Sequence, residues 1–448
     1  MLFWAPSVRG IAEAERRPMI MLRRSYWQEA NAASAALPNV ELPSQADVAV
    51  VGGGLAGVSA AIAILQRQPG VRVVLLEARF IGFGASGRSG GLISPVPAPV
   101  WLLTADRNPD HAWALRTLNS KVHELGKWLA ATMPGAEVVP STLRLQAMGR
   151  FSASGLARVA TTLERIGIAF ALAPDAHRGS LLTLELPTFT VHPYRLVRAL
   201  ATYAEGLGAQ ICEHAHVDGI VPTDGGVVVQ LSGRIPLRTR KLVMCTNAYT
   251  GAIIAPSAPR AKVVHNYMLA TEPLEEDALR QLGSGRAFMV ELNKSYVFYR
   301  LHRTRLLYGG VETLFRKPAS EFAVPTSVRK ALEGQLAKSI PWYRRLRIAS
   351  AWSGAFHSTT TDLPIVTRAA GAGAIVFNVG YGGTGLALTQ LLAPHAAALA
   401  LDLSLADADD ARLGAVIHDT GVPIRGLLRL GAGVAWDVTC GRSHLKSP

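Results

Sequence analysis

Cysteine is scarce in this chain of 448 residues: Cys212, Cys245 and Cys440 are the only three, and they lie far apart. An odd, widely spaced set excludes a disulfide framework and a Cys-x-x-Cys metal pair. No cluster of His, Cys and Asp has the spacing of metal ligands, so no metal site is expected. A reducing, cytoplasmic location fits this cysteine usage best.

Charged side chains are also few, at 17% of residues against 49% hydrophobic, which excludes a disordered or polyelectrolyte chain. The net charge of +14 raises the question of anionic partners. The basic residues occur in small groups without the interleaved aromatics that stack on bases, so no nucleic acid is expected as a partner. A basic nucleic-acid or membrane binder stays as an alternative, which a steep salt dependence of binding would reveal.

Long hydrophobic runs are absent apart from residues 48–65, which have 18 uncharged positions, the lower limit for spanning a bilayer. Three consecutive glycines, beginning at Gly52, interrupt that run and favour a buried strand, turn and helix, so no membrane span is expected. The arginine pairs before residue 25 are not followed by the apolar stretch of a secretion signal. Residues 1–24 are therefore expected to be a disordered extension.

A strand, a glycine turn and a helix follow one another near the N-terminus. Residues 47–51 are a β-branched run, residues 55–68 have helical spacing, and residues 71–77 indicate a second strand. The turn at residues 52–57 reads Gly-Gly-Gly-Leu-Ala-Gly and satisfies Gly-x-Gly-x-x-Gly. In this context the pattern predicts a parallel βαβ unit that binds a dinucleotide.

The glycines and the following acid each have a physical task. Gly52 permits the tight turn, Gly54 lets a pyrophosphate approach the backbone, and Gly57 allows the helix to pack on the strand. Glu77 ends the second strand, where its carboxylate can accept hydrogen bonds from ribose hydroxyls, and it favours FAD or NAD over NADP. A glycine-rich turn in an ordinary α/β sheet is the alternative, but it leaves Glu77 without a stated partner.

Two further glycine-rich stretches favour a flavin. Residues 83–92 supply small side chains and backbone donors suited to close passage along a pyrophosphate and a flat ring. Residues 380–385 form a second glycine turn between an expected strand and an expected helix over 386–401. A helix starting near Thr384 would point its positive end at a flavin, where negative charge collects on reduction, although the turn can also be read as purely structural.

The sequence resembles the D-amino acid oxidase-like FAD-dependent oxidoreductases, the group that contains sarcosine and glycine oxidases. The likeness is nearest to the γ-glutamylputrescine oxidoreductase-like members and covers about residues 25–410. It rests on collinear stretches: Ser25-Tyr-Trp, Gly84-Ala-Ser-Gly-Arg-Ser-Gly-Gly91, His192-Pro-Tyr-Arg-Leu, Cys245-Thr-Asn-Ala-Tyr-Thr250, Ala270-Thr-Glu-Pro-Leu274, Tyr299-Arg-Leu, Arg305-Leu-Leu-Tyr-Gly-Gly310, Trp352-Ser-Gly354 and Gly380-Tyr-Gly-Gly-Thr-Gly385.

The resemblance implies an α/β fold with a Rossmann-like FAD-binding domain of the GR2 type and an inserted substrate domain with an antiparallel sheet. We expect residues 25–115, 186–262 and 345–410 in a discontinuous FAD-binding domain. Residues 116–185 and 263–344 are expected to form the substrate-binding domain, and 411–448 a C-terminal tail.

The resemblance also implies the residues that bind FAD. Those expected to bind the cofactor are Gly52, Gly54, Leu55, Ala56, Gly57, Glu77, Ala78, Ala85, Ser86, Arg88, Gly90, Gly91, Leu92, Val217, Gly380, Gly382, Gly383, Thr384 and Gly385. The cysteine that some members bond to the flavin falls near Ala355, so non-covalent FAD is expected.

The activity implied is oxidation of a C–N bond of a small-molecule amine or amino-acid derivative to an imine, which water hydrolyses. His357, Tyr381 and Arg300 are the substrate-facing candidates. His357, or Phe356, stands where glycine oxidase-like members place a carboxylate-binding arginine, and Arg300 is a candidate substitute. Leu307 stands where sarcosine oxidase-like members place a lysine that speeds reaction with O2, which leaves O2 or another electron acceptor open.

Two alternatives to a flavin-dependent amine oxidoreductase remain: an NAD-dependent dehydrogenase and a flavin-binding protein without turnover. The first gives no reason for the stretches at 84–91 and 380–385. The sequence leaves the oligomeric state and the amine open.

Overall fold

The computed structural model describes residues 24–30, 41–173, 182–254, 261–283, 287–292, 297–314, 324–340, 342, 346–359 and 361–418. Of the expected extension over 1–24, only Arg24 belongs to these residues, and most of the expected tail over 411–448 lies outside them. The first part of that tail continues a helix, α11.

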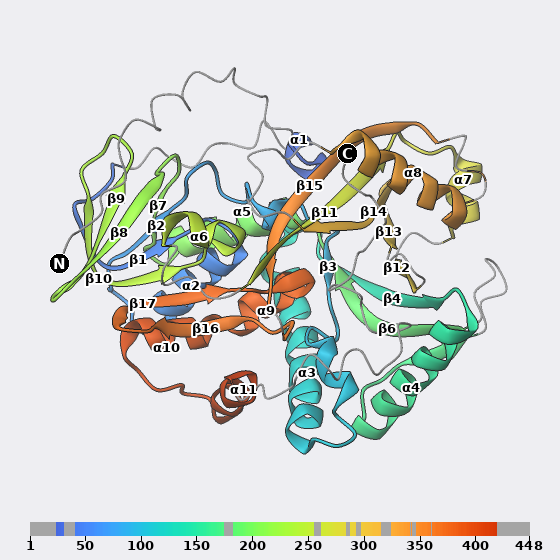
Figure 1. The fold of residues 1–448 in the computed structure, drawn as a ribbon, viewed down its shortest axis with the longest axis horizontal. Coiled ribbons are helices and arrows are strands. Elements are labelled where there is room, and N and C mark those ends of the chain that lie inside the picture. Colours follow the sequence, from blue (N-terminus) through green and yellow to red (C-terminus); the bar gives the residue numbers. More distant parts are fainter. Residues whose placement is uncertain are drawn as a thin grey trace.

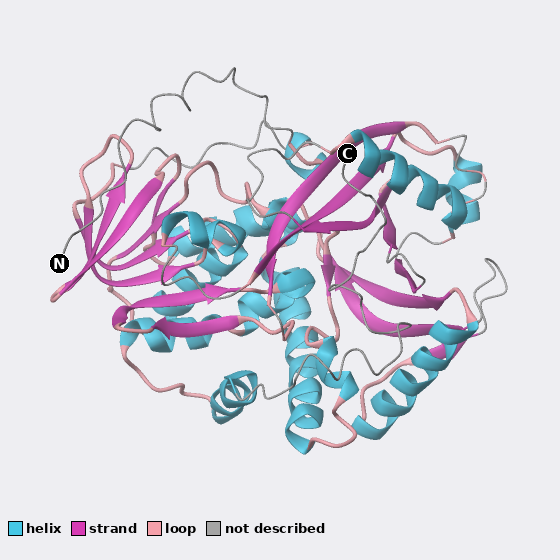
Figure 2. Ribbon diagram, in the orientation of Figure 1, coloured by secondary structure: helices cyan, strands magenta, loops and turns pink. Residues whose placement is uncertain are grey.

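Two sheets lie side by side and helices surround them (Figures 1 and 2). The first sheet has the strand order β16-β17-β10-β1-β2-β7, with β9 on β10 and β8 on β9. The strands β17, β10, β1, β2 and β7 run parallel, and β16, β9 and β8 are antiparallel to their neighbours. The strands of this sheet are β1 (Gln45–Val51), β2 (Val73–Leu76), β7 (Gln210–Cys212), β8 (Val217–Thr223), β9 (Gly226–Leu231), β10 (Leu237–Met244), β16 (Ile365–Ala369) and β17 (Ala372–Val379).

The second sheet has the order β15-β11-β14-β13-β12-β4-β6-β3, with β5 on β6. Every pair in it is antiparallel except β12 and β4. Its strands are β3 (Leu92–Ile93), β4 (Val139–Ala147), β5 (Ala171–Ala173), β6 (Leu182–Thr190), β11 (Lys262–Thr271), β12 (Ala287–Leu292), β13 (Val297–His302), β14 (Arg305–Leu314) and β15 (Ile348–Ser358).

The helices fall into groups that cover one sheet or the other. Helices α2, α5 and α10 pack together against the first sheet, and α8 covers the face of the second sheet that carries Tyr267, Tyr299 and Tyr308. The helices are α1 (Tyr26–Glu29), α2 (Leu55–Arg67), α3 (Pro109–Thr132), α4 (Arg150–Ile166), α5 (Pro193–Gly206), α6 (Thr250–Ile253), α7 (Glu276–Leu282), α8 (Thr326–Ser339), α9 (Gly385–Leu391), α10 (Ala393–Leu401) and α11 (Ala408–His418).

The predicted α/β fold, with a parallel Rossmann-like sheet and a mostly antiparallel second sheet, is confirmed. Two details differ from the sequence-based expectation. The helix expected over 386–401 is two helices, because Pro394 stands in the first turn of α10 and cannot continue α9. Strand β15 belongs to the second sheet, through its pairing with β11, although the boundary expected at residue 345 assigns it to the first domain.

Helices α9 and α10 are rich in alanine and leucine. No single helix among the described residues is long and apolar enough to cross a membrane. Residues 382–391 together with α10 meet that test by length and composition alone, with a 59° bend between them.

Candidate functional site

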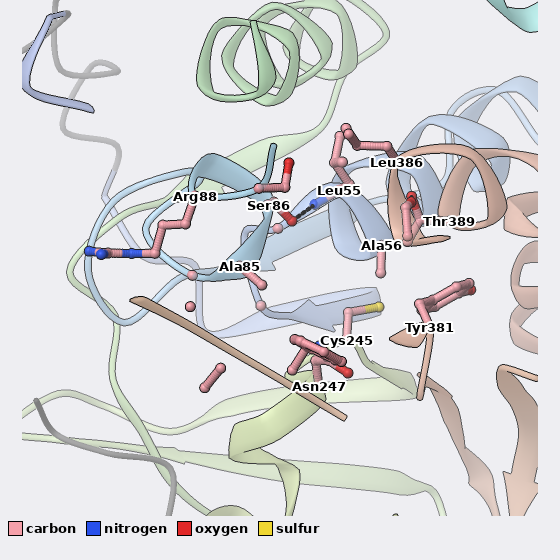
Figure 3. Close-up of a pocket in the computed structure, with 18 of the residues that line it drawn as sticks. Leu55, Ala56, Ala85, Ser86, Arg88, Cys245, Asn247, Tyr381, Leu386 and Thr389 are labelled. Carbon is pink, nitrogen blue, oxygen red and sulfur yellow. Dashed lines mark hydrogen bonds between the residues drawn. The ribbon is translucent and has the colours of Figure 1, made fainter. Parts of the chain in front are cut away.

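A cavity of about 610 Å³ runs between the two sheets. The first sheet contributes the segments that follow β1, β2, β10 and β17, and the second sheet contributes side chains of β4, β11, β12, β13, β14 and β15. The carboxyl ends of neighbouring parallel strands meet at the edge of the sheet where the chain turns into helices, and ligands bind there in open α/β sheets. Figure 3 shows part of the wall, with Ser86 facing the start of α2.

The turn after β1 needs glycine for reasons of space. Gly52 has φ +111°, and a Cβ atom there would lie 2.7 Å from the carbonyl oxygen of Cys245. A Cβ at Gly57 would lie 1.9 Å from the carbonyl oxygen of Gly52, so α2 can approach the turn only with glycine at that position. A Cβ at Gly54 would lie 2.9 Å from the Ser86 hydroxyl, which itself accepts a hydrogen bond from Leu55 N at 2.9 Å.

Glu77 fixes the same turn from the end of β2. Its Oε2 accepts from Gly53 N at 2.7 Å and its Oε1 from Arg79 N at 2.8 Å. Burial raises the pKa of Glu77, while the two backbone hydrogen bonds act against that rise. Each carboxylate oxygen has a second lone pair, and the side chain lines the cavity.

Arg88 holds the loop between residues 82 and 92 in place. Its Nε donates to Phe83 O at 2.8 Å, its Nη1 donates to Ser353 O at 3.2 Å, and its guanidinium lies 5.4 Å from the centre of the Phe83 ring. Burial lowers the pKa of Arg88 to about 10. Because these carbonyls belong to the loop and to β15, Arg88 ties the loop to the second sheet.

Asn247 and Tyr249 follow β10 and also line the cavity. Asn247 has φ +44°, and its Oδ1 accepts from the backbone N–H groups of His357 and Gly380, both at 3.3 Å. The buried hydroxyl of Tyr249 has no hydrogen-bond partner among the described residues, and burial raises the pKa of Tyr249 to about 12. A polar group of this kind points to a ligand in the cavity.

The second glycine turn lies opposite the first. Gly380 has φ +83° and packs against Thr359, while Gly382, Gly383, Thr384 and Gly385 line the cavity. Helix α9 begins at Gly385 and has seven residues. Tyr381 lines the cavity too, but its hydroxyl donates to Asn378 Oδ1, and burial raises the pKa of Tyr381 well above its usual value.

Of the residues expected to bind the cofactor, all but Gly57 and Gly380 line this one cavity, and these two lie directly behind it. Their roles as FAD ligands stay predictions, but the cavity fits such a cofactor. A glycine cradle, a carboxylate at the end of β2 and a phenol without a partner among the described residues line one continuous cavity. Among the described residues, no group of three or more His, Cys, Asp and Glu side chains could hold a metal ion.

Two of the three substrate-facing candidates lie outside the wall. His357 pairs with Val263 on β11, whereas Phe356 and Gly354, on the other face of β15, line the cavity. Burial lowers the pKa of His357 to about 4, and its Nδ1 has no partner among the described residues. Only Tyr381 of the three lines the cavity.

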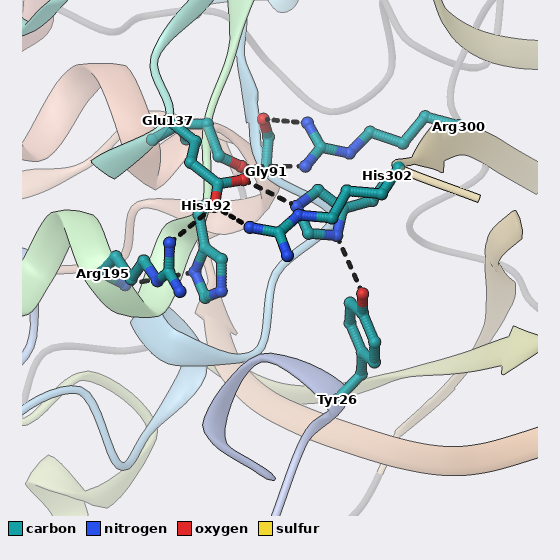
Figure 4. Close-up of polar contacts among 9 residues, drawn as sticks. Tyr26, Gly91, Glu137, His192, Arg195, Arg300 and His302 are labelled. Atoms are coloured by element: carbon teal, nitrogen blue, oxygen red, sulfur yellow. Dashed lines mark hydrogen bonds and ion pairs between the residues drawn. The ribbon is translucent and has the colours of Figure 1, made fainter. Parts of the chain in front are cut away.

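Arg300 lies behind Gly91 in a buried cluster of charged and aromatic side chains (Figure 4). Its two terminal nitrogens donate to Gly91 O at 3.2 Å and Val191 O at 3.0 Å, and its guanidinium lies 5.2 Å from the centre of the Trp27 ring. Burial lowers the pKa of Arg300 to about 10. The residue thus supports the backbone beside the cavity instead of facing into it.

Glu137 lies at the centre of the same cluster. It pairs with Arg195 at 2.6 Å, with Arg303 at 2.8 Å and with His302 at 2.9 Å, and Tyr26 contacts the other nitrogen of His302 at 2.9 Å. Although burial acts to raise it, the pKa of Glu137 is held at about 2 by His302 and Arg303. The cluster joins α1, α5 and β13 beside the cavity.

The second sheet closes the cavity with an apolar surface that also carries two polar side chains, Asn266 and Glu312. The apolar residues are Leu143 and Leu145 of β4, Met268 of β11, Phe288 and Val290 of β12, and Phe298 of β13. Sequence reasoning missed Asn266 and Glu312. Nothing in the sequence singled them out from the other polar residues of the two strands, and only the strand pairing shows that the two meet.

The fold and cavity define a two-sheet protein with a glycine-lined cavity at the carboxyl ends of a parallel sheet and an apolar chamber beyond it. Residues 47–399 match the family model of the FAD dependent oxidoreductases, DAO, and the chain belongs to this family. It is an FAD-dependent oxidoreductase.

Relatives and solved structures agree with this assignment. The chain is 28% identical to γ-glutamylputrescine oxidoreductase of Escherichia coli (strain K12) over 365 residues, which cover 77% of this chain and 81% of that protein. It superposes on glycine oxidase from Geobacillus kaustophilus with a TM-score of 0.64 and 19% identity, over 81% and 96% of the two chains. It superposes on L-proline dehydrogenase from P. horikoshii with a TM-score of 0.67 and 18% identity, over 84% of this chain and 99% of that one. These two structural likenesses show the fold.

Proposed function

We propose that this protein oxidises a C–N bond of a small-molecule amine by hydride transfer to non-covalently bound FAD, giving an imine that water hydrolyses. The observation that carries the proposal is the continuity of the cavity from the glycine turn after β1 to the apolar wall of the second sheet. A cofactor bound at the glycine turn would therefore contact a substrate bound against the apolar wall. The matched relative is named for an oxidoreduction of an amine, γ-glutamylputrescine.

The chain's own part in this reaction is to bind, to orient and to exclude water. FAD supplies the hydride acceptor when bound. The residues of β4, β12 and β13 form an apolar wall that keeps water from the substrate, and Tyr381 closes the side next to the second glycine turn. Hydride transfer depends on the orientation of the donor carbon more than on an acid or base. It therefore does not require the Tyr381 hydroxyl, which is bound to Asn378, or His357, which lies outside the cavity wall.

Non-covalent attachment is supported by the chemistry of the wall. Ala355 lines the cavity where some family members carry the bonding cysteine. Cys245 also lines it, but burial raises the pKa of its thiol to about 12, and the thiol contacts Asn378 at 3.6 Å. A thiol that stays protonated is a poor nucleophile.

The choice of electron acceptor rests on fewer features. The wall, over the residues that the structure describes, contains no lysine, and Leu307 is fully buried. These features favour slow reaction of the reduced flavin with O2 and an acceptor other than O2. Comparing reoxidation by air with reoxidation by a soluble quinone tests this part.

The experiment that tests the proposal begins with the visible spectrum of the purified protein, followed by denaturation. Flavin absorption, with FAD released into the supernatant, is the expected result. Anaerobic addition of a panel of alkylamines should then bleach the flavin. A colourless protein that takes up NAD but not FAD would contradict the proposal, and so would an FAD-loaded protein that no amine bleaches.

A further inference from the structure

A carboxyl group and a carboxamide stand together in the apolar wall of the substrate chamber. Asn266 of β11 and Glu312 of β14 are opposite each other in the strand register, and Asn266 Nδ2 donates to Glu312 Oε1 at 3.4 Å. Both line the cavity, as does Met268, two residues after Asn266. The neighbour of Asn266 on β15 is Gly354, which also lines the cavity.

Glu312 has no cation to neutralise it among the described residues. It belongs to no ion pair there, and the charge that acts on it is that of Asp362, which has the same sign. Burial, with a smaller contribution from Asp362, raises the pKa of Glu312 to about 7, against the opposing hydrogen bond from Asn266. A buried carboxylate of this kind is stabilised when a cation enters its pocket.

The other titratable groups on the strands around Glu312 do not supply that cation. His265 and His357 alternate with Asn266 and Phe356 along β11 and β15 and so occupy the opposite face of the sheet. Burial raises the pKa of Asp362, and Lys262 acts against that rise; Lys262 does not line the cavity. Over the part of the chain that the structure describes, no cationic side chain therefore occupies the position next to Glu312.

The cations that do line the cavity are engaged elsewhere. Arg88 donates to the carbonyls of Phe83 and Ser353, and the charge of Arg79 acts on Glu77 at the end of β2. A substrate carboxylate placed near Glu312 would meet a like charge, not a guanidinium.

We propose that Glu312, held in place by Asn266, binds the ammonium group of the substrate and so selects cationic alkylamines over simple α-amino acids. The inference rests on the proposed function, because it names the substrate class of the same site. Glu312 acts in binding and specificity, and its carboxylate is placed to take the ammonium proton that the substrate must lose before hydride can leave the carbon. The chamber beside it is apolar, so the rest of the substrate next to the ammonium group is a hydrocarbon chain.

The test uses tert-butylammonium, an amine with no hydrogen on the carbon that bears nitrogen, so that it binds as a cation without being oxidised. The FAD-loaded protein is titrated with it at pH 8, and binding is followed by the change in flavin absorption. The neutral isostere tert-butanol is titrated in parallel. We expect the wild-type protein to bind the cation at least about tenfold more tightly than the alcohol.

Glu312→Gln removes the charge and keeps the shape and a hydrogen-bond acceptor for Asn266. This variant should lose the preference for the cation while retaining its FAD content. Asp362→Asn is the matched control: it also removes a negative charge near Glu312, but from a residue outside the cavity wall, and it should keep the preference.

The outcomes separate this inference from the proposed function. Equal affinity for tert-butylammonium in wild type and Glu312→Gln, or no preference for the cation in wild type, overturns the role of Glu312 even if amines bleach the flavin. A lost preference in Glu312→Gln alone supports it, whether or not any amine is oxidised. Failure of every amine to bleach FAD-loaded protein counts against the proposed function alone.

Discussion

Glu312 shows how one side chain can carry a cost in stability that a ligand removes. In the folded protein its pKa is raised to about 7, above its ordinary value of 4.5. Between these two values the folded state binds more protons than the unfolded state, so this group destabilises the fold progressively as pH rises through that range. Below pH 4.5 the carboxyl is protonated in both states and the difference disappears.

This reasoning predicts a pH-dependent gain in stability for Glu312→Gln. Without amine, the variant should be more stable than wild type at pH 8, on the order of 1–3 kcal/mol, and close to wild type at pH 4. Thermal melting at the two pH values measures the difference. Glu164→Gln, at an exposed position on α4, serves as the control and should give no comparable gain. A Glu312→Gln variant that is less stable at pH 8 would contradict the assigned electrostatics.

Arg300 gives a second prediction at the scale of single residues. Because its guanidinium donates to Gly91 O and Val191 O and lies over Trp27, Arg300→Met should remove the side-chain donor of both carbonyls, of which Gly91 O keeps its backbone donor, Val191 N. The expected cost is about 2–4 kcal/mol in stability, with weaker retention of FAD. Relative rates with amines and with α-amino acids should stay the same. A selective loss of activity on α-amino acids would show instead that Arg300 binds their carboxylate.

At the scale of elements, the approach of α2 to the turn after β1 is set by missing side chains. A Cβ at residue 57 would overlap the carbonyl oxygen of Gly52 at 1.9 Å, whereas a Cβ at residue 54 would meet only the Ser86 hydroxyl, at 2.9 Å. Backbone cannot move aside as a small hydroxyl can. The two substitutions should therefore differ sharply.

We predict that Gly57→Ala displaces α2, lowers stability by more than about 3 kcal/mol and yields protein without FAD. Gly54→Ala should fold and bind FAD more weakly than wild type. Gly206→Ala at the end of α5 is the control, because nothing lies within 4 Å of the added methyl group and the residue does not line the cavity. FAD content after gel filtration and the melting temperature report both effects. Full FAD content in Gly57→Ala would show that the turn is more pliable than its contacts indicate.

Features that depend on residues close together in the chain could be predicted from the sequence, and features that depend on distant residues could not. The βαβ unit was predictable because its strand, turn and helix are adjacent in the chain and each glycine has a local reason. The exclusion of His357 from the wall was not predictable, because it depends on which face of the second sheet the residue occupies once β15 pairs with β11. The same holds for Asn266 and Glu312, which lie 46 residues apart in the chain and meet only through the pairing of β11 with β14.

On the scale of the whole molecule, the cavity is the place where the two sheets share a wall. Arg88 links the loop after β2 to β15, Trp352 Nε1 donates to Arg88 O at 2.8 Å, and Asn247 joins the end of β10 to β15. A ligand that fills the space between these contacts touches both sheets, and its binding free energy therefore adds to the stability of both.

Removing FAD should consequently loosen both sides of the cavity and not the glycine turn alone. In hydrogen exchange, protein stripped of FAD should lose protection at residues 52–57 and 84–91 of the first side and also along β4 and β12 of the second, and FAD added back should restore both. The surface strand pair β8–β9 beyond Val217 serves as an internal reference, because residues 219–230 do not line the cavity. A change confined to residues 52–57 and 84–91 would mean that the bound cofactor stops short of the second sheet. Because the apolar wall then would not face the flavin, hydride transfer to FAD from a substrate in that chamber would be excluded.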